Sequence, residues 1–274
     1  MKFGIATFIT DQSTRPAPLG RALEERGFDS LLIAEHSHIP AERSTPYPGG
    51  GELPDIYYRT LDPFVALAAV AAATQRLLVG TGVALVAQRD PIHTAKEVAS
   101  LDLISDGRFL FGVGSGWNRE EMADHGTDPT TRGRLVNERL RAMIELWTKE
   151  QAEFHGEFVD FGPSFAWPKP VRKPYPPIYV GGGRGAFQRV AELGDAWLAN
   201  SLPPEVLAPQ IDEMRAVAGR DVPVTVYAVS GRPEVIEEYA KLDVERVLFY
   251  LPSDPEPATL TRLDRLAGVM ARFS

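Results

Sequence analysis

Short apolar segments recur along the chain, and none of them alternates apolar with polar residues. A strand that is buried on both faces has this continuous pattern, as the strands of a parallel sheet do. The segments therefore predict eight parallel strands, over residues 2–8, 28–35, 76–85, 108–115, 176–182, 196–201, 222–230 and 244–252.

Stretches with helical periodicity separate these segments. Asp62-Pro63 and Asp90-Pro91 each open such a stretch, with a capping aspartate and a proline in the first turn. Eight strand–helix units in 274 residues predict a (β/α)8 TIM barrel, as a single domain over residues 1–274. A doubly wound open sheet is the alternative. It needs fewer strands and usually has a glycine-rich turn after the first strand, where this chain reads ATFITD.

Three connections, over residues 37–60, 116–130 and 151–175, are longer than simple turns. The first two follow strands, so we expect them as extended loops at the carboxyl-terminal face of the barrel, where barrel enzymes have their active sites. The third follows a helix and contains FHGEFVDF, which predicts a small hairpin.

Composition narrows the classes of function. The chain has no cysteine, which excludes disulfides, thiolate nucleophiles and cysteine-based metal sites, so redox chemistry would need a bound cofactor. A net charge of −8 argues against a nucleic-acid partner. The opening residues resemble a strand rather than a signal peptide, and the apolar stretch 63–87 is interrupted by Gln75 and Arg76, which argues against a membrane span. We expect a soluble cytoplasmic protein that binds a small-molecule substrate.

Glycines follow three of the predicted strands. The run Gly112–Gly116 is not a dinucleotide-binding turn, because Trp117 stands where the motif needs its third glycine. With Gly80-Thr81-Gly82 and Gly181-Gly182-Gly183, it places bare backbone at three strand ends, where a flat group can approach closely. Relief of crowding inside the barrel is the alternative. Gly181–Gly183 and the adjacent Arg184 also predict an anion site at a helix start.

The second predicted strand ends in Glu35-His36. Histidine exchanges protons near neutral pH, so His36 is the candidate for proton transfer. Glu35 is the candidate for orienting either His36 or a ring bound at the mouth. A structural histidine is the alternative, and His38 is a second catalytic candidate. The two histidines of HSH have no third ligand nearby, so no metal site is expected.

Three longer runs carry a family resemblance. The sequences GTGVALVAQRDPIHTAKEVASLDLISDGRFLFGVGSGWNREEM, WPKPVRKPYPPIYVGGG and ELGDAWLA closely resemble the luciferase-like flavin and deazaflavin oxidoreductases. Within them the chain is most similar to the branch that depends on coenzyme F420, an 8-hydroxy-5-deazaflavin. The resemblance extends from Lys2 to about Leu202. It implies a TIM barrel with the cofactor ring across the carboxyl-terminal mouth.

The resemblance also implies roles for particular residues. A hydride would move between F420 and a small organic substrate, with His36 as proton partner and Glu35 beside it. A non-proline cis peptide at Gly82-Val83 would support the ring. Gly181–Gly183 and Arg184 would hold the phosphate. The expected cofactor-binding set is completed by residues of the fourth strand end: Gly114, Ser115, Gly116 and Trp117.

Trp117 is also a departure, because sugar-phosphate dehydrogenases of the family have a catalytic glutamate there. It argues against that reaction. Three tyrosines of the loop 37–60 are expected to close over the ring: Tyr47, Tyr57 and Tyr58. The basic run Lys169, Arg172 and Lys173 is expected to be a solvated loop. The alternative, if a deazaflavin binds, is that this run meets the anionic tail of the cofactor.

Alternatives remain open at this stage. The same barrel could use FMN and molecular oxygen as a monooxygenase, or bind a flavin without turnover. The resemblance also implies a homodimer. The other residues have simpler interpretations: Glu120 and Glu121 as the start of a helix, Trp147 as core, and His93, His125 and His155 as surface or cap residues.

Overall fold

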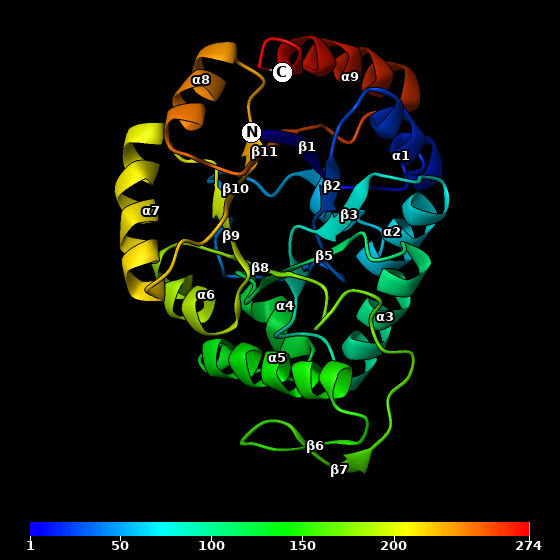
Figure 1. The fold of residues 1–274 in the computed structure, drawn as a ribbon, viewed down its shortest axis with the longest axis vertical. Coiled ribbons are helices and arrows are strands. Elements are labelled where there is room, and N and C mark those ends of the chain that lie inside the picture. Colours follow the sequence, from blue (N-terminus) through cyan, green and yellow to red (C-terminus); the bar gives the residue numbers. More distant parts are fainter. Residues whose placement is uncertain (274) are drawn as a thin grey trace.

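The computed structural model describes residues 1–273, and in this part of the chain eight parallel strands close into a barrel (Figure 1). β1 pairs with both β2 and β11, and the pairing of β3 with β5 closes the ring. The predicted TIM barrel is thus confirmed. Its strands are β1 (Lys2–Thr7), β2 (Ser30–Ile33), β3 (Leu78–Thr81), β5 (Phe109–Gly114), β8 (Ile178–Gly181), β9 (Ala196–Asn200), β10 (Val224–Val229) and β11 (Arg246–Tyr250). A two-residue strand, β4 (Ala84–Leu85), also pairs with β5.

Helices surround the barrel (Figure 1). The Asp62 and Asp90 side chains accept the amides of Val65 and His93, at 3.0 and 2.8 Å, and so cap α2 and α3 as predicted. The predicted hairpin is also present, as β6 (Ala152–His155) and β7 (Asp160–Ser164). The helices are α1 (Pro16–Glu25), α2 (Pro63–Ala72), α3 (Pro91–Ile104), α4 (Arg119–Asp124), α5 (Arg132–Thr148), α6 (Phe187–Leu193), α7 (Pro204–Ala218), α8 (Pro233–Lys241) and α9 (Glu256–Met270), with 3-10 turns η1 (Asp55–Tyr58) and η2 (Arg184–Ala186).

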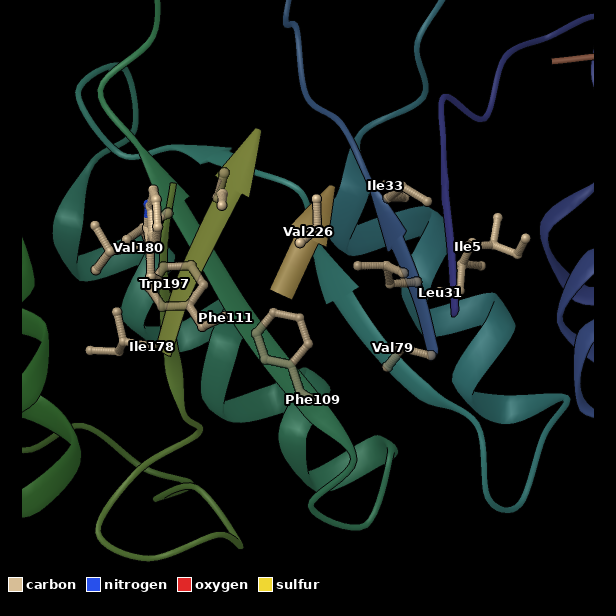
Figure 2. Close-up of a cluster of buried hydrophobic side chains, with 14 of the residues drawn as sticks. Ile5, Leu31, Ile33, Val79, Phe109, Phe111, Ile178, Val180, Trp197 and Val226 are labelled. Atoms are coloured by element: carbon tan, nitrogen blue, oxygen red, sulfur yellow. The ribbon is translucent and has the colours of Figure 1, made fainter. Parts of the chain in front are cut away.

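The strands are apolar on both faces because each face packs in a different core. Outward side chains such as Ile5, Phe109 and Phe111 pack with the helices (Figure 2), and Trp147 of α5 belongs to this outer core as predicted. The strand residues that alternate with these outward side chains point into the barrel. They form an inner core: Ala6, Leu32, Leu110, Tyr179, Ala196, Leu198 and Leu248.

A buried ion pair closes the amino-terminal end of the barrel. The Arg246 guanidinium is 1% exposed and donates to both carboxylate oxygens of Asp29, at 3.0 to 3.1 Å, and to the Tyr179 hydroxyl at 3.1 Å. Burial alone lowers the pKa of Arg246, but the Asp29 carboxylate outweighs burial and raises it. Asp29 therefore keeps a cation stable inside the barrel.

Asp29→Ala should lower the free energy of unfolding by about 3 kcal/mol, because it leaves a buried charge without its partner. Chemical denaturation measures this loss. The matched control is Asp264→Ala, which removes an exposed partner of Arg26 at 2.7 Å. That change should cost less than about 1 kcal/mol. Equal losses in the two variants would contradict the role given to Asp29.

Candidate active site

A cavity of about 530 Å³ opens at the carboxyl-terminal ends of the barrel strands. It exists because small residues end several strands, among them Ala6, Gly114 and Gly181. Residues that sequence analysis singled out meet in its lining: Glu35, His36, Gly82, Val83, Gly114, Ser115, Gly116, Trp117, Gly181 and Gly182.

Val83 forms the floor of this cavity. The peptide bond between Gly82 and Val83 is cis, as predicted. A Cβ atom added to Gly114 would lie 2.5 Å from Val83 Cγ2, and one added to Gly181 would lie 2.7 Å from Val83 Cγ1. Because real Cβ atoms do not come so close, the two glycines form a socket for the Val83 side chain. Below the socket, Val83 packs on the inner core.

Other glycines make room for neighbouring strands. A Cβ on Gly112 would lie 1.8 Å from the carbonyl oxygen of Thr81, and one on Gly80 would lie 2.7 Å from that of Leu110. Relief of crowding is therefore the correct explanation for these two positions. Gly116 has a φ of +73° and serves the turn that follows β5.

His36 is held by a carboxylate from another element. Its Nδ1 lies 2.7 Å from Oε2 of Glu121 in α4, and the two side chains are 5% and 0% exposed. The other oxygen, Oε1, accepts the Ser37 amide at 3.1 Å. Thr60 donates to the His36 carbonyl at 2.7 Å and fixes the backbone. Within residues 1–273 no protein group bonds Nε2 of His36, which leaves this nitrogen for a ligand in the cavity that His36 lines.

Glu35 does not orient His36, which corrects the expectation from sequence. Its Oε2 accepts the Leu85 amide and its Oε1 accepts Nε of Arg89, each at 2.6 Å. Arg89 also reaches Asp62 at 2.6 Å and Glu97 at 2.9 Å. Burial lowers the pKa of Arg89, but these carboxylates outweigh burial and raise it. Glu35 therefore ties the end of β2 to the segment that follows Val83.

Aromatic rings surround His36 on the loop side of the cavity. Ring centroids of Tyr57 and Trp117 lie 5.0 and 5.8 Å from the imidazole. Tyr47 packs against both of these rings, at 5.3 and 6.0 Å. Tyr58 does not share their place, because it is 53% exposed and lies outside the cavity lining. Two of the three tyrosines expected near the ring, Tyr47 and Tyr57, thus form an aromatic wall with Trp117.

The loop 37–60 is fastened to α4 by Glu120. Its Oε1 accepts the Ser44 amide at 2.8 Å, the Ser44 hydroxyl at 2.7 Å and the Thr45 amide at 3.2 Å. Hydrogen bonds from Thr45 and Ser44 lower the pKa of Glu120 to about 2. The carboxylate therefore stays ionised, and the loop fastened, across the neutral and mildly acidic range.

A second cavity, of about 700 Å³, adjoins the first and shares Ser115, Gly181 and Gly182 with it. Gly183 and Arg184 line it, so the predicted phosphate residues lie beside the mouth and not at its centre. Arg184 bonds Glu213 at 2.6 Å. Three further arginines, which sequence analysis missed, complete this basic lining: Arg119, Arg132 and Arg189.

Comparison with known proteins decides the family. Residues 1–252 match the family described as luciferase-like monooxygenase. The chain belongs to this family. It is therefore an oxidoreductase of the luciferase-like class, and the resemblance seen in its motifs is confirmed.

Relatives of this luciferase-like enzyme use two kinds of cofactor. It is 40% identical to an uncharacterized protein of Mycobacterium tuberculosis H37Rv, over 99% of both chains. It is 31% identical to the FMNH2-dependent dimethylsulfone monooxygenase of Pseudomonas putida, over 65% of this chain and 53% of that protein. It is 29% identical to the F420-dependent glucose-6-phosphate dehydrogenase of Kineococcus radiotolerans, over 72% of this chain and 57% of that protein.

Solved structures share the luciferase-like fold. The monooxygenase RslO1 of Streptomyces bottropensis superposes with a TM-score of 0.80 at 19% identity, over 100% of both chains. The coenzyme F420 dependent tetrahydromethanopterin reductase of Methanopyrus kandleri superposes with a TM-score of 0.76 at 19% identity, over 100% of this chain and 99% of that chain.

The basic run of this luciferase-like barrel lies away from the mouth, which argues against the alternative that it meets the cofactor tail. Lys169 donates to the carbonyl of Leu146 at 2.7 Å, near the end of α5, and the Arg172 amide donates to Asp102 of α3 at 2.9 Å. The run precedes β8, so it lies at the amino-terminal end of the strands. The arginines of the second cavity are the basic side chains beside the mouth.

Within residues 1–273 of the luciferase-like chain, no helix has the length and apolar character of a membrane span. No group of three or more metal-ligating side chains is found there either. His93 and His155 are exposed as predicted, with side chains 88% and 62% accessible. His125 is exposed as well, but it bonds the Ser37 hydroxyl at 2.7 Å.

Proposed function

We propose that this enzyme transfers a hydride between coenzyme F420 and a small, uncharged organic substrate, and that His36 moves the accompanying proton. The proposal rests on the hydrogen bonding of the two ring nitrogens of His36. Its Nδ1 is committed to Glu121, whereas its Nε2 has no protein partner among the described residues and belongs to a side chain in the cavity lining. That nitrogen can exchange a proton with a substrate.

The residues present fit a deazaflavin with a charged tail. The first cavity offers an apolar floor at Val83 and glycine backbone at Gly114 and Gly181, against which a flat ring can lie. The adjoining cavity offers arginines to the phosphate and acidic tail. Within residues 1–273, the side chains of Arg119 and Arg132 form no hydrogen bond or ion pair, so both are free to bind an anion. When bound, F420 supplies a carbon that accepts or donates the hydride.

The lining of the first cavity indicates the class of substrate. No lysine or arginine lines it, and the Glu35 carboxylate is already paired with Arg89. Tyr57 and Trp117 present apolar ring surface beside His36. A phosphorylated substrate would find no cation there, whereas a neutral alcohol or ketone would find apolar walls and one proton-transfer group.

Titration of the purified protein with F420 and with FMN, followed by absorbance, tests the cofactor. We expect tighter binding of F420. Submicromolar affinity for FMN without affinity for F420 would instead favour the FMN-dependent monooxygenase. Tight F420 binding without turnover of any neutral alcohol or ketone would overturn the proposed class of substrate and leave the cofactor standing.

Arg132→Ala should weaken F420 binding about tenfold or more, because a hydrogen bond to a charged group contributes about 1.5 to 3 kcal/mol. The control is Arg134→Ala, two residues along the same helix, where the side chain pairs with Glu157 instead. The loss should shrink as salt is added, since salt screens exposed charges. Equal F420 affinities of the Arg132 and Arg134 variants would contradict the proposal that the anionic tail of F420 binds in the second cavity.

Assembly as a homodimer, a cytoplasmic location and a single-domain organisation stay predictions. Sedimentation of the purified protein measures the first of these.

A further inference from the structure

We propose that Glu121 is a positioning residue that fixes the tautomer of His36, with the proton on Nδ1 and the lone pair on Nε2. The inference concerns a residue that sequence analysis took for a helix start. Its catalytic consequence rests on the proposed function, but the tautomer itself is a property of the protein without ligand.

The two oxygens of Glu121 are both committed. Oε2 lies 2.7 Å from Nδ1 of His36, and Oε1 accepts the Ser37 amide at 3.1 Å. The side chain is fully buried, so water does not compete for either oxygen. One carboxylate thus holds both the imidazole and the backbone that follows it.

This geometry determines where the proton of a neutral imidazole lies. An ionised carboxylate only accepts hydrogen bonds, so a histidine nitrogen beside it must be the donor. The bond made by one ring nitrogen decides the state of the other. With Nδ1 protonated against Glu121, Nε2 faces its ligand as an acceptor.

Other polar groups surround the pair. The Ser37 hydroxyl lies 3.5 Å from Oε1 of Glu121 and 2.9 Å from Nδ1 of His38. The same hydroxyl also bonds His125, and His38 bonds Asp124 at 3.0 Å. On the other side lie the rings of Tyr57 and Trp117. None of these groups is bonded to Nδ1 of His36, so Glu121 alone sets the tautomer.

The consequence is that neutral His36 acts as a base. When a substrate alcohol is oxidised, its O–H bond breaks and the proton joins Nε2; oxidised F420, when bound, would be the acceptor of the hydride from the adjacent carbon. The products are a carbonyl compound, reduced F420 and an imidazolium ion paired with the Glu121 carboxylate. In the reverse direction the imidazolium returns the proton from Nε2 to the carbonyl oxygen.

Glu121→Gln separates this role from a merely structural one. The amide has one oxygen, and the Ser37 amide needs it as an acceptor. The amide NH2 group then faces Nδ1 of His36, which must accept, so the proton moves to Nε2. Glu120→Gln is the matched control, because Glu120 is next in sequence but bonds Ser44 and Thr45.

Nitrogen-15 NMR of histidine-labelled protein, without cofactor and at alkaline pH, measures the tautomer. The chain has five histidines, and the signals of His36 are those lost in His36→Asn. We expect protonated Nδ1 in the unsubstituted protein and in Glu120→Gln, and protonated Nε2 in Glu121→Gln. A proton on Nε2 in the unsubstituted protein would overturn the proposal, and this spectrum needs no variant of Glu121 to fold. A proton on Nδ1 in Glu121→Gln would overturn it as well.

A second measurement connects the tautomer to turnover. In protein loaded with F420, Glu121→Gln should slow single turnover by about 10² to 10⁴, the range of general acid–base catalysis, with an unchanged Kd for F420. An unchanged rate alongside a switched tautomer would overturn the positioning role. If F420 does not bind at all, the proposed function fails, while the NMR result still decides the tautomer.

Discussion

Replacing His36 with alanine is expected to slow hydride transfer by about 10² to 10⁴, while the affinity for F420 stays nearly unchanged. The reason is geometric: Nε2 of His36 is unbonded by protein in the cavity lining, and no other histidine lines that cavity in residues 1–273. A structural histidine would behave in the opposite way, since its loss would lower the melting temperature and cofactor affinity and leave the rate per loaded site intact.

Single-turnover oxidation or reduction of bound cofactor measures this effect. His36→Asn adds a sharper comparison, because an amide keeps a hydrogen bond but cannot transfer a proton at neutral pH. His93→Ala is the control, since the His93 side chain is 88% exposed on α3. Unchanged rates in both His36 variants would remove His36 from the mechanism. His38, the second candidate from the sequence, lies outside the cavity lining, and its ring nitrogens are bonded to Ser37 and Asp124.

Adding one methyl group at Gly114 should weaken F420 binding by about 10- to 100-fold. The new Cβ would lie 2.5 Å from Val83 Cγ2, so Val83 must leave its socket and rise into the cavity. Overpacking of this kind typically costs about 1 to 3 kcal/mol, and a loss of 1.4 kcal/mol is tenfold in affinity. Equilibrium titration of Gly114→Ala with F420 gives the value.

The double variant Gly114→Ala with Val83→Ala should recover much of the lost affinity, because the smaller residue at 83 vacates the space that the methyl group needs. Such non-additivity is expected for residues in contact. Gly162→Ala is the control, since a Cβ at that hairpin position meets no atom within 4 Å. If the losses in F420 binding free energy of the two single variants simply add in the double variant, Val83 is not the side chain that the new methyl group displaces.

The barrel was predictable because its strands and helices differ in periodicity over long stretches. Apolar strands alternate with capped helices, and the Asp62 and Asp90 caps are present in the structure. The site was predictable in outline for the same reason, since residues at the carboxyl ends of parallel strands must meet. His36 and Val83 both follow strand ends and meet at one cavity, whereas the cis peptide before Val83 was implied by the family resemblance and not by topology.

The partners of these residues were not predictable in the same way. Glu120 and Glu121 are adjacent in sequence, yet on a helix they point about 100° apart. One fastens a surface loop, and the other is buried against His36. Acidic residues are favoured at helix starts, and both glutamates satisfy this preference. The preference therefore does not show which of the two contacts His36. Glu35 is next to His36 in sequence, but its carboxylate accepts from Leu85 and Arg89 instead, and neither partner could be identified from the family's acidic-His pair.

The basic run had two interpretations in the sequence, a solvated loop and a partner for the cofactor tail. Topology separates them, because Lys169 and Arg172 precede a strand and so lie at the end of the barrel away from the mouth. Arg119 and Arg132 follow a strand and lie beside the mouth.

The Asp29–Arg246 pair and the cavity of the candidate active site lie at opposite ends of one barrel, with the inner core between them. Stability and chemistry are thus assigned to different residues. Natural variation or laboratory evolution can change the loop 37–60 and its aromatic wall without disturbing the ion pair that holds the strands at the other end. This enzyme should therefore tolerate substitutions at its mouth, although most of its strand residues are buried. Mutant libraries designed to change its substrate selectivity should vary Tyr47, Tyr57 and Trp117.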